Sequence, residues 1–173
     1  MKTIFALICA TLITGCASYD GRGLAPGVSG VAEIVQLMGE PAMRFAEPDG
    51  GQSLVYPRGP YGFHTYMFRL DAAGTLLSRE NVLEPKHFAR LREGMTEEGV
   101  MRIIGPAWPG WTIYFAARDE LVWEWRWCDD FGEPARFNVL FDGTSHKVRT
   151  TANLTERQSM PFGSGDRRSW CSR

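Results

Sequence analysis

The sequence contains little of what metal enzymes, hydrolases and nucleic-acid-binding proteins use. Its 19 basic and 20 acidic residues nearly balance and form no basic stripe, which argues against nucleic acid as a partner. It has no Gly-x-Ser-x-Gly elbow and no phosphate-cradling glycine loop. The histidines His64, His87 and His146 lack metal-ligand spacing, and no cysteine pair is spaced for zinc. We therefore expect a protein that is not an enzyme and that uses neither a metal nor a cofactor.

The sequence also lacks a hydrophobic run long enough to cross a bilayer as a helix. The apolar run 4–13 follows Lys2 and leads into Ile13, two small residues and Cys16. This arrangement is typical of a lipobox, in which a peptidase binds the small residues and the cysteine thiol accepts diacylglycerol. A plain secretory signal is the alternative, but it usually has a small residue where Ile13 stands. We expect residues 1–15 to be removed as a signal peptide and Cys16 to be lipidated.

The residues after Cys16 indicate where the anchored protein goes. A multiply acylated cysteine is a durable anchor, because each buried CH₂ contributes about 0.8 kcal/mol. In Gram-negative lipoproteins an Asp after the cysteine retains the protein in the inner membrane, and here Ala17 follows it. By resemblance to that sorting pattern, we expect the periplasmic face of the outer membrane. Residues 16–28, rich in small residues, predict a flexible tether.

Two cysteines remain once Cys9 leaves with the leader and Cys16 carries lipid. A disulfide between Cys128 and Cys171 would close a loop of 43 residues. Loss of loop entropy in the unfolded chain would then stabilise the fold by about 4 kcal/mol. The alternative is one cysteine buried in a strand and the other free near the C-terminus, and the sequence leaves both open. Residues 154–173 are polar and aperiodic, and predict a mobile tail.

The stretch 96–106 predicts a short helix. Thr96 is a suitable N-cap, and the two glutamates after it favour the positive end of the helix dipole. An apolar face and a stop signal follow: Val100, Ile103 and Ile104, then Gly105 and Pro106. The same pattern stands 66 residues earlier, as Ile34, Leu37, Met38 and Gly39.

Strand-like sequence follows each helix. The first copy has 53–56, 64–71 and 75–79, and the second has 112–116, 120–127, 136–142 and 147–152. The later strands align with a shift of 71, which places extra residues of the second copy at 129–135. We therefore predict an α+β fold of two tandem units, 29–83 and 84–153, with 85–92 as a short linking helix. Each unit is a helix packed on one face of an antiparallel meander.

Three tryptophans alternate with charged residues over 123–127. Strand alternation puts Trp123, Trp125 and Trp127 on one face and Glu124 with Arg126 on the other. The favoured interpretation makes the tryptophans core beneath the second helix and the charged pair a solvated face. The alternative is an aromatic surface that binds a partner, because Trp and Arg dominate interface hot spots.

Two more tryptophans, Trp108 and Trp111, lie in a Pro/Gly turn after the second helix. They are less obviously buried than the strand tryptophans. They are therefore the preferred exposed anchors for a partner.

The stretch 88–100, FARLREGMTEEGV, followed by Ile103-Ile104-Gly105-Pro106, resembles the SmpA/OmlA (BamE-like) outer-membrane lipoproteins. That family pattern continues with a strand bearing tryptophan, matched by Trp123 and Trp125, and a strand ending in Phe141-Asp142. The family usually has one residue between the Gly and the Pro, which 39–41 keeps and 105–106 does not. The resemblance is convincing over 82–150 and weak over 29–81.

The resemblance implies helices on antiparallel sheets, arranged in tandem as in β-lactamase-inhibitor-like proteins. It also implies a non-enzymatic lipoprotein that binds envelope proteins, the β-barrel assembly complex among them. The first functional hypothesis is therefore a scaffold or accessory factor in outer-membrane protein assembly or envelope integrity. The alternative is a periplasmic inhibitor or ligand-binding lipoprotein that uses the sheet face and its tryptophans.

Overall fold

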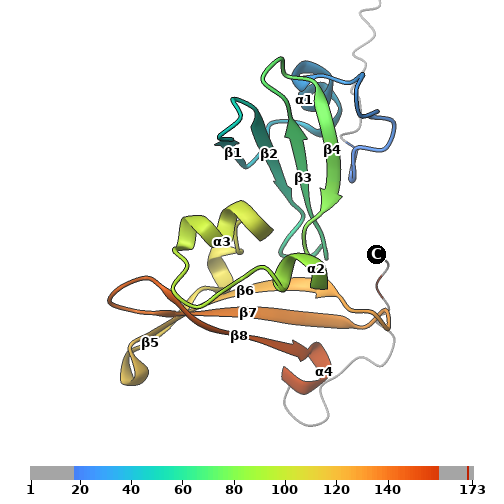
Figure 1. The fold of residues 1–173 in the computed structure, drawn as a ribbon. Coiled ribbons are helices and arrows are strands. Elements are labelled where there is room, and N and C mark those ends of the chain that lie inside the picture. The colour runs from blue at the N-terminus through green and yellow to red at the C-terminus, as the bar shows by residue number, and fades with distance from the viewer. Residues whose placement is uncertain (1–17, 160–170, 172–173) are drawn as a thin grey trace, which may run out of the picture.

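The computed structural model describes residues 18–159 and Cys171. The fold is α+β, with two four-stranded antiparallel sheets of strand order β1-β2-β3-β4 and β5-β6-β7-β8 (Figure 1). The lipobox and Cys16 lie outside the described residues, as does most of the C-terminal segment. Among the helices of the described part, none is both long and apolar enough to cross a membrane.

The first unit is α1 (Val31–Met38) followed by β1 (Met43–Ala46), β2 (Gln52–Pro57), β3 (Thr65–Leu70) and β4 (Leu76–Asn81). Alternation along β2 and β3 gives the sheet two covered faces. Ile34 and Met38 of α1 pack on one face against Leu54 and Phe68. The sequence did not predict β1, because Phe45 is its single buried side chain and leaves no alternation to read.

The second unit contains α2 (Pro85–Phe88), α3 (Glu97–Ile104), η1 (Pro109–Trp111), β5 (Ile113–Phe115) and η2 (Ala116–Arg118). It continues with β6 (Glu120–Cys128), β7 (Pro134–Asp142), β8 (Val148–Thr155) and α4 (Glu156–Ser159). The α3 helix begins as predicted, since the Thr96 hydroxyl accepts a hydrogen bond from the Gly99 N–H at 3.1 Å. The linking helix is shorter than predicted and ends at Phe88.

Helix α3 lies between the two sheets (Figure 1). Val100 and Ile104 are fully buried in the core of the second unit. Met101 points the other way and packs on the face of the first sheet opposite α1, beside Phe45. Arg102 donates to the Ala46 carbonyl at 3.0 Å and stacks over the Phe45 ring. One short helix therefore supplies core residues to both units.

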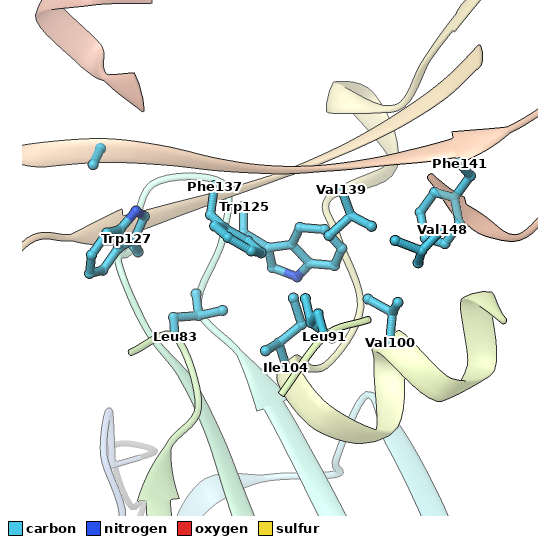
Figure 2. Close-up of a cluster of buried hydrophobic side chains, with 11 residues drawn as sticks. Leu83, Leu91, Val100, Ile104, Trp125, Trp127, Phe137, Val139, Phe141 and Val148 are labelled. Atoms are coloured by element: carbon cyan, nitrogen blue, oxygen red, sulfur yellow. The ribbon is translucent and has the colours of Figure 1, made fainter. Parts of the chain in front are cut away.

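The strand tryptophans are core, as the favoured interpretation predicted. Trp125 and Trp127 are each 3% exposed and Trp123 is partly buried against the same cluster. Figure 2 shows Trp125 lying over Leu91 and Ile104, with Trp127 farther along the strand near Leu83. The prediction that Glu124 and Arg126 form a solvated face is wrong, because both are half-buried in ion pairs described below.

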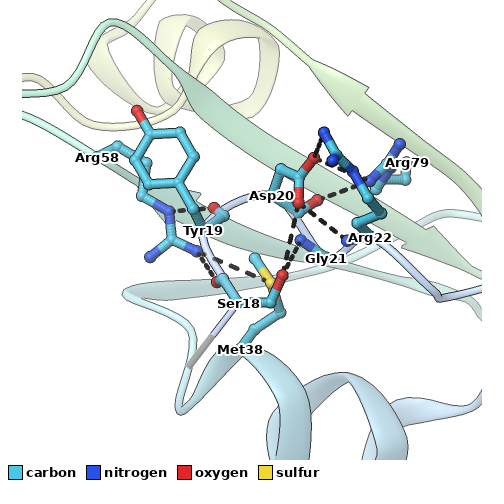
Figure 3. A network of polar contacts seen from close by, with 8 residues as sticks. All are labelled: Ser18, Tyr19, Asp20, Gly21, Arg22, Met38, Arg58 and Arg79. Carbon is cyan, nitrogen blue, oxygen red and sulfur yellow. Dashed lines mark hydrogen bonds and ion pairs between the residues drawn. The ribbon is translucent and has the colours of Figure 1, made fainter. Parts of the chain in front are cut away.

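The predicted flexible tether is wrong for residues 18–28. Residues 18–30, here called the strap, are hydrogen-bonded to the first unit at both ends, and Figure 3 shows the contacts of residues 18–22. Ser18 donates its N–H to the Leu37 carbonyl at 2.7 Å, and Gly27 donates to Leu76 at 2.8 Å. Glycine and small residues indicated a linker, but here they allow the chain to lie close against a folded sheet.

The predicted mobile tail is wrong at its start. Strand β8 runs to Thr155, and α4 follows with Glu156 only 7% exposed. Farther on, Cys171 is joined to Cys128 by a disulfide, with Cα atoms 5.7 Å apart, and its N–H bonds to the Gly132 carbonyl. Cys171 is thus covalently fixed to the end of β6.

The contact between α3 and the first sheet can be tested with two glycines of nearly identical backbone conformation. Gly39 and Gly105 end α1 and α3 with φ of 82° and 75°, in a region that favours glycine. A Cβ at 105 would lie 2.7 Å from Thr65 and 3.0 Å from Val55, whereas one at 39 would meet nothing. We expect Gly39→Ala to lower the free energy of unfolding by about 1–3 kcal/mol. Gly105→Ala should lower it by a further ~1–3 kcal/mol, because the added methyl overpacks the junction.

Urea denaturation of both variants would measure this difference. Equal losses in the two variants would mean that α3 does not pack on the first sheet as described.

Candidate functional site

Strand β6 has an edge that is only partly paired. Strand β5 pairs with it in a three-residue ladder, Ile113–Val122, Tyr114–Leu121 and Phe115–Glu120. Strand β6 continues to Cys128, and beyond Val122 no strand of the described chain pairs with that edge. An unpaired edge presents a row of backbone N–H and C=O groups to whatever lies beside it.

A groove of about 380 Å³ lies along this edge, between the two units. The second unit lines it with aromatic and apolar side chains, namely Pro106, Trp108, Trp111 and Trp125, and Leu83 of the segment between the units adds to them. The first unit contributes Met43, Pro57 and Thr65 from the face that carries Met101 of α3. Glu124 and Arg126 of β6 complete the lining. A mostly apolar groove with a few convergent polar groups is the usual form of a binding site.

The groove brings together three of the five tryptophans that the sequence singled out. Trp108 is 45% exposed, as its place in the turn suggested. Trp111 is half-buried, because its ring stacks on the Arg136 guanidinium at 4.1 Å. Trp125, which is 3% exposed, is the third lining tryptophan. Two aromatic side chains of different exposure therefore flank the unpaired strand.

The other two tryptophans do not reach the groove. Trp127 donates its Nε1–H to Asn153 at 2.9 Å and packs edge-on against Phe88. Trp123 packs against Phe141, with ring centroids 4.9 Å apart. Both pack in the core of the second unit, and neither lines the groove.

The indole N–H of Trp125 is buried and has no hydrogen-bond acceptor among the described residues. A buried donor without an acceptor costs about 1–3 kcal/mol, and native structures rarely keep one without a reason. Figure 2 shows this nitrogen on the side of the indole that faces Ile104 and Leu91, so the donor belongs to the core of the second unit.

A network of ion pairs supports the polar side of β6. Arg126 donates Nε and Nη2 to the two oxygens of Glu156 at 2.6 and 2.9 Å. Arg136 donates to the same carboxylate at 2.7 Å and to Glu124 at 2.7 Å. Burial alone would raise the pKa of Glu156, but Arg126 and Arg136 outweigh it and hold that pKa below its ordinary value. The network fixes the groove's charged side chains rather than leaving them free.

Arg126 also joins the network to the first unit. Its guanidinium donates to the Tyr61 carbonyl at 3.1 Å and lies 4.2 Å from the centre of the Phe63 ring. Both partners belong to the loop between β2 and β3. Arg126 thus joins β6, at the groove, to the β2–β3 loop, 65 residues away in sequence.

A second, smaller cavity of about 180 Å³ lies between the first sheet, α2 and α3. His87 lines it, and burial lowers the pKa of this histidine, although the Glu80 carboxylate 3.1 Å from Nε2 partly opposes the shift. Burial therefore favours the neutral imidazole. In the described part of the chain no group of His, Cys, Asp and Glu side chains is arranged to hold a metal ion.

Sequence reasoning missed the residues that the first unit contributes to the groove. Met43, Pro57 and Thr65 carry no local signal of function, and they reach the site only because α3 brings the two sheets together. The unpaired edge of β6 was missed for a different reason. The sequence predicted the 112–116 strand but not that its pairing would stop at Val122.

Comparisons with known proteins add little to this description. No protein-family model matches the chain, and no curated protein matches it. A solved structure of an extracellular protein containing a SCP domain, from Bacillus anthracis str. Ames, is similar at 10% identity and a TM-score of 0.30. The similarity covers 88% of this chain and 50% of that one, so this chain spans about half its length. A likeness this low carries no argument about fold or function.

The contribution of Glu156 to stability should depend on pH. Its depressed pKa in the folded state means that it stabilises the fold above its unfolded pKa, and that this is lost as pH falls. We expect Glu156→Gln to lower the free energy of unfolding at pH 7 by about 2 kcal/mol. The difference from the unmodified protein should shrink as pH falls below the ordinary range of a glutamate.

Glu133→Gln is the matched control, because Glu133 pairs with Arg157 at 2.8 Å on the exposed surface. That variant should change stability by less than about 1 kcal/mol. Chemical denaturation at several pH values would measure both. A pH-independent loss for Glu156→Gln would contradict the ion-pair account.

Proposed function

We propose that this protein is a non-enzymatic, lipid-anchored envelope protein that holds an extended segment of a partner protein in the groove between its two units. One observation carries the proposal: the unpaired edge of β6 runs inside a groove walled by Trp108 and Trp111. An extended backbone is the natural complement of such an edge, because it supplies carbonyl and N–H groups at the spacing of a strand.

In this groove the backbone of a bound segment would determine affinity, and its side chains would determine selectivity. Main-chain hydrogen bonds to β6 would supply affinity for any extended segment. Alternate side chains of the segment would face the indoles of Trp108 and Trp111, which favour apolar or proline-containing sequences. These features suit binding and supply no nucleophile–base pair for catalysis.

The lipid anchor and the class of partner rest on the sequence. The lipobox over 13–16 supports lipidation of Cys16, and Ala17 supports sorting to the periplasmic face of the outer membrane. The resemblance to SmpA/OmlA lipoproteins supports envelope proteins as partners, the β-barrel assembly complex among them. The role that follows is a scaffold or accessory factor in outer-membrane protein assembly or envelope integrity.

A tandem, BamE-like relationship between the two units is part of this proposal. Each unit has a helix followed by a four-stranded meander. A register shift falls at Arg69/Leu70 in the first sheet and at Leu140/Phe141 in the second, which are 71 residues apart. Gly39 and Gly105 also end their helices with equivalent hydrogen bonds of 2.9 Å. These matches support duplication of one unit.

The second candidate function is a periplasmic inhibitor or ligand-binding lipoprotein. The enclosed volume between Trp108, Trp111 and Trp125 favours it, because a small apolar molecule could fill that space without pairing with β6. The two functions differ in what happens to the backbone of β6. Only a bound polypeptide strand would protect its edge amides from exchange with solvent.

Photo-crosslinking in living cells would test the groove. A photoreactive residue at Trp108 should crosslink to an envelope protein, and one at Leu77, which is 53% exposed on β4 away from the groove, should not. Peptides from the crosslinked region should then slow hydrogen exchange of residues 123–127 in the purified protein, and Trp108→Ala should weaken their binding. Crosslinks of equal strength at both positions, or binding that leaves exchange over 123–127 unchanged, would refute strand pairing.

Mass spectrometry of the protein purified from membranes would test the anchor. The N-terminal peptide should begin at Cys16 with acyl chains attached. Cys16→Ser should move the protein from the membrane fraction to the soluble one, since acyl chains are the proposed means of attachment. Recovery of an unacylated chain that keeps residues 1–15 would contradict the lipidation.

A further inference from the structure

The strap is held most firmly at its first described residues (Figure 3). Arg58, at the end of β2, donates Nη2 to the Ser18 carbonyl at 2.9 Å and Nε to the Tyr19 carbonyl at 2.6 Å. Ser18 itself donates to Leu37 at the end of α1. One guanidinium thus binds two successive carbonyl groups, which fixes both the position and the direction of the chain.

The next residues extend this attachment. The Tyr19 hydroxyl is hydrogen-bonded to His64 Nδ1 at 2.9 Å, and its ring lies edge-on to Tyr66. Arg79 donates to the Asp20 carbonyl at 2.9 Å and pairs with the Asp20 carboxylate at 3.7 Å. Contacts from β2, β3 and β4 therefore all converge on residues 18–20.

This attachment begins two residues after Cys16. Two residues of extended chain span at most about 7 Å, so Cys16 must lie within that distance of Ser18 wherever it points. A flexible tether over 16–28 would instead have let the anchor move by about 20 Å relative to the folded unit. Acyl chains on Cys16 would therefore hold the first unit close to the bilayer.

The strap lies on the same face of the first sheet as α1. Leu24 of the strap packs on the cluster that contains Ile34 of α1 and Phe68 of β3. The groove is lined from the opposite face, by Met43, Pro57 and Thr65 beside Met101 of α3. The place of attachment and the proposed binding site are thus separated by the thickness of the sheet.

We propose that the face of the first unit formed by α1 and the strap lies directly against the lipid headgroups, so that the groove opens on the side away from the bilayer. The proposal rests on the lipidation of Cys16 proposed above. The exposed side chains of α1 and the strap include Arg22, with 87% of its side chain exposed, Val28, which is 80% exposed, and the exposed Glu33 and Gln36 of α1. Most of these are polar, which suits contact with headgroups rather than insertion.

This orientation gives the groove a defined role in the envelope. A protein on a flexible tether would present its groove in every direction. A protein held by its strap would present the groove only to partners that approach from the aqueous side. The short link between Cys16 and Ser18 would then act as a positioning device as well as an anchor.

Depth-dependent quenching of the lipidated, full-length mature protein in vesicles would test the orientation. The vesicles contain phosphatidylethanolamine and phosphatidylglycerol, with and without nitroxide-labelled headgroups. A fluorophore is attached at Gln36→Cys on α1 in one variant and at Lys147→Cys, an exposed position of the second unit, in another. We expect the headgroup quencher to cause a strong loss of fluorescence at 36 and little at 147.

A matched variant carries about 12 Gly and Ser residues between Ala17 and Ser18, which adds roughly 20 Å of slack without altering the fold. In this variant the loss of fluorescence at 36 should fall towards the value at 147. Mass spectrometry of the same samples establishes acylation, so a failure of the anchor and a failure of the orientation are distinguishable. With acylated protein, equal quenching at the two positions, or quenching at 36 that the insertion leaves unchanged, would overturn the proposal.

Discussion

The structure depends on one short helix that is buried on two sides. Helix α3 sends Val100 and Ile104 into the second core and Met101 into the first, while the backbone at Gly105 lies against Thr65 and Val55. Burial of apolar side chains on both sides fixes the two sheets relative to each other far more firmly than a linker would. Without α3 the face of the first sheet opposite α1 would be exposed, and the two walls of the groove would not face each other.

The groove exists because two neighbouring strands of the second sheet differ in length. Strand β6 has nine residues and its outer neighbour β5 has three, so a stretch of β6 edge remains unpaired. Soluble proteins usually protect such edges with charge, covering loops or short strands. Here the edge lies in a cleft, flanked by Trp108 and Trp111 and supported by the Glu156 network on its polar side. The side chains that line the groove thus also flank the unpaired stretch of β6.

Local patterns predicted much of the second unit and less of the first. The cap at Thr96, the apolar face of α3 and the alternation over 123–127 are signals within one element, and each corresponds to what the structure contains. The sequence wrongly predicted flexible segments at the strap and at α4. Small and polar residues are typical of linkers, but they are equally typical of segments whose main-chain groups are hydrogen-bonded to a folded unit. The hydrogen bonds from Arg58 to main-chain carbonyls cannot be predicted from the sequence, because every residue has a main-chain carbonyl.

What the sequence determined by itself is therefore the local chemistry: the helix starts and stops, and which tryptophans share a strand face. These follow from neighbours within a few residues, where spacing alone decides which groups can meet. Tertiary structure alone decided that Trp108, Trp111 and Trp125 line one groove with Met43 and Thr65, and that Cys171 returns to Cys128. Such contacts join residues dozens of positions apart, and they exist only because the two cores pack around the same helix.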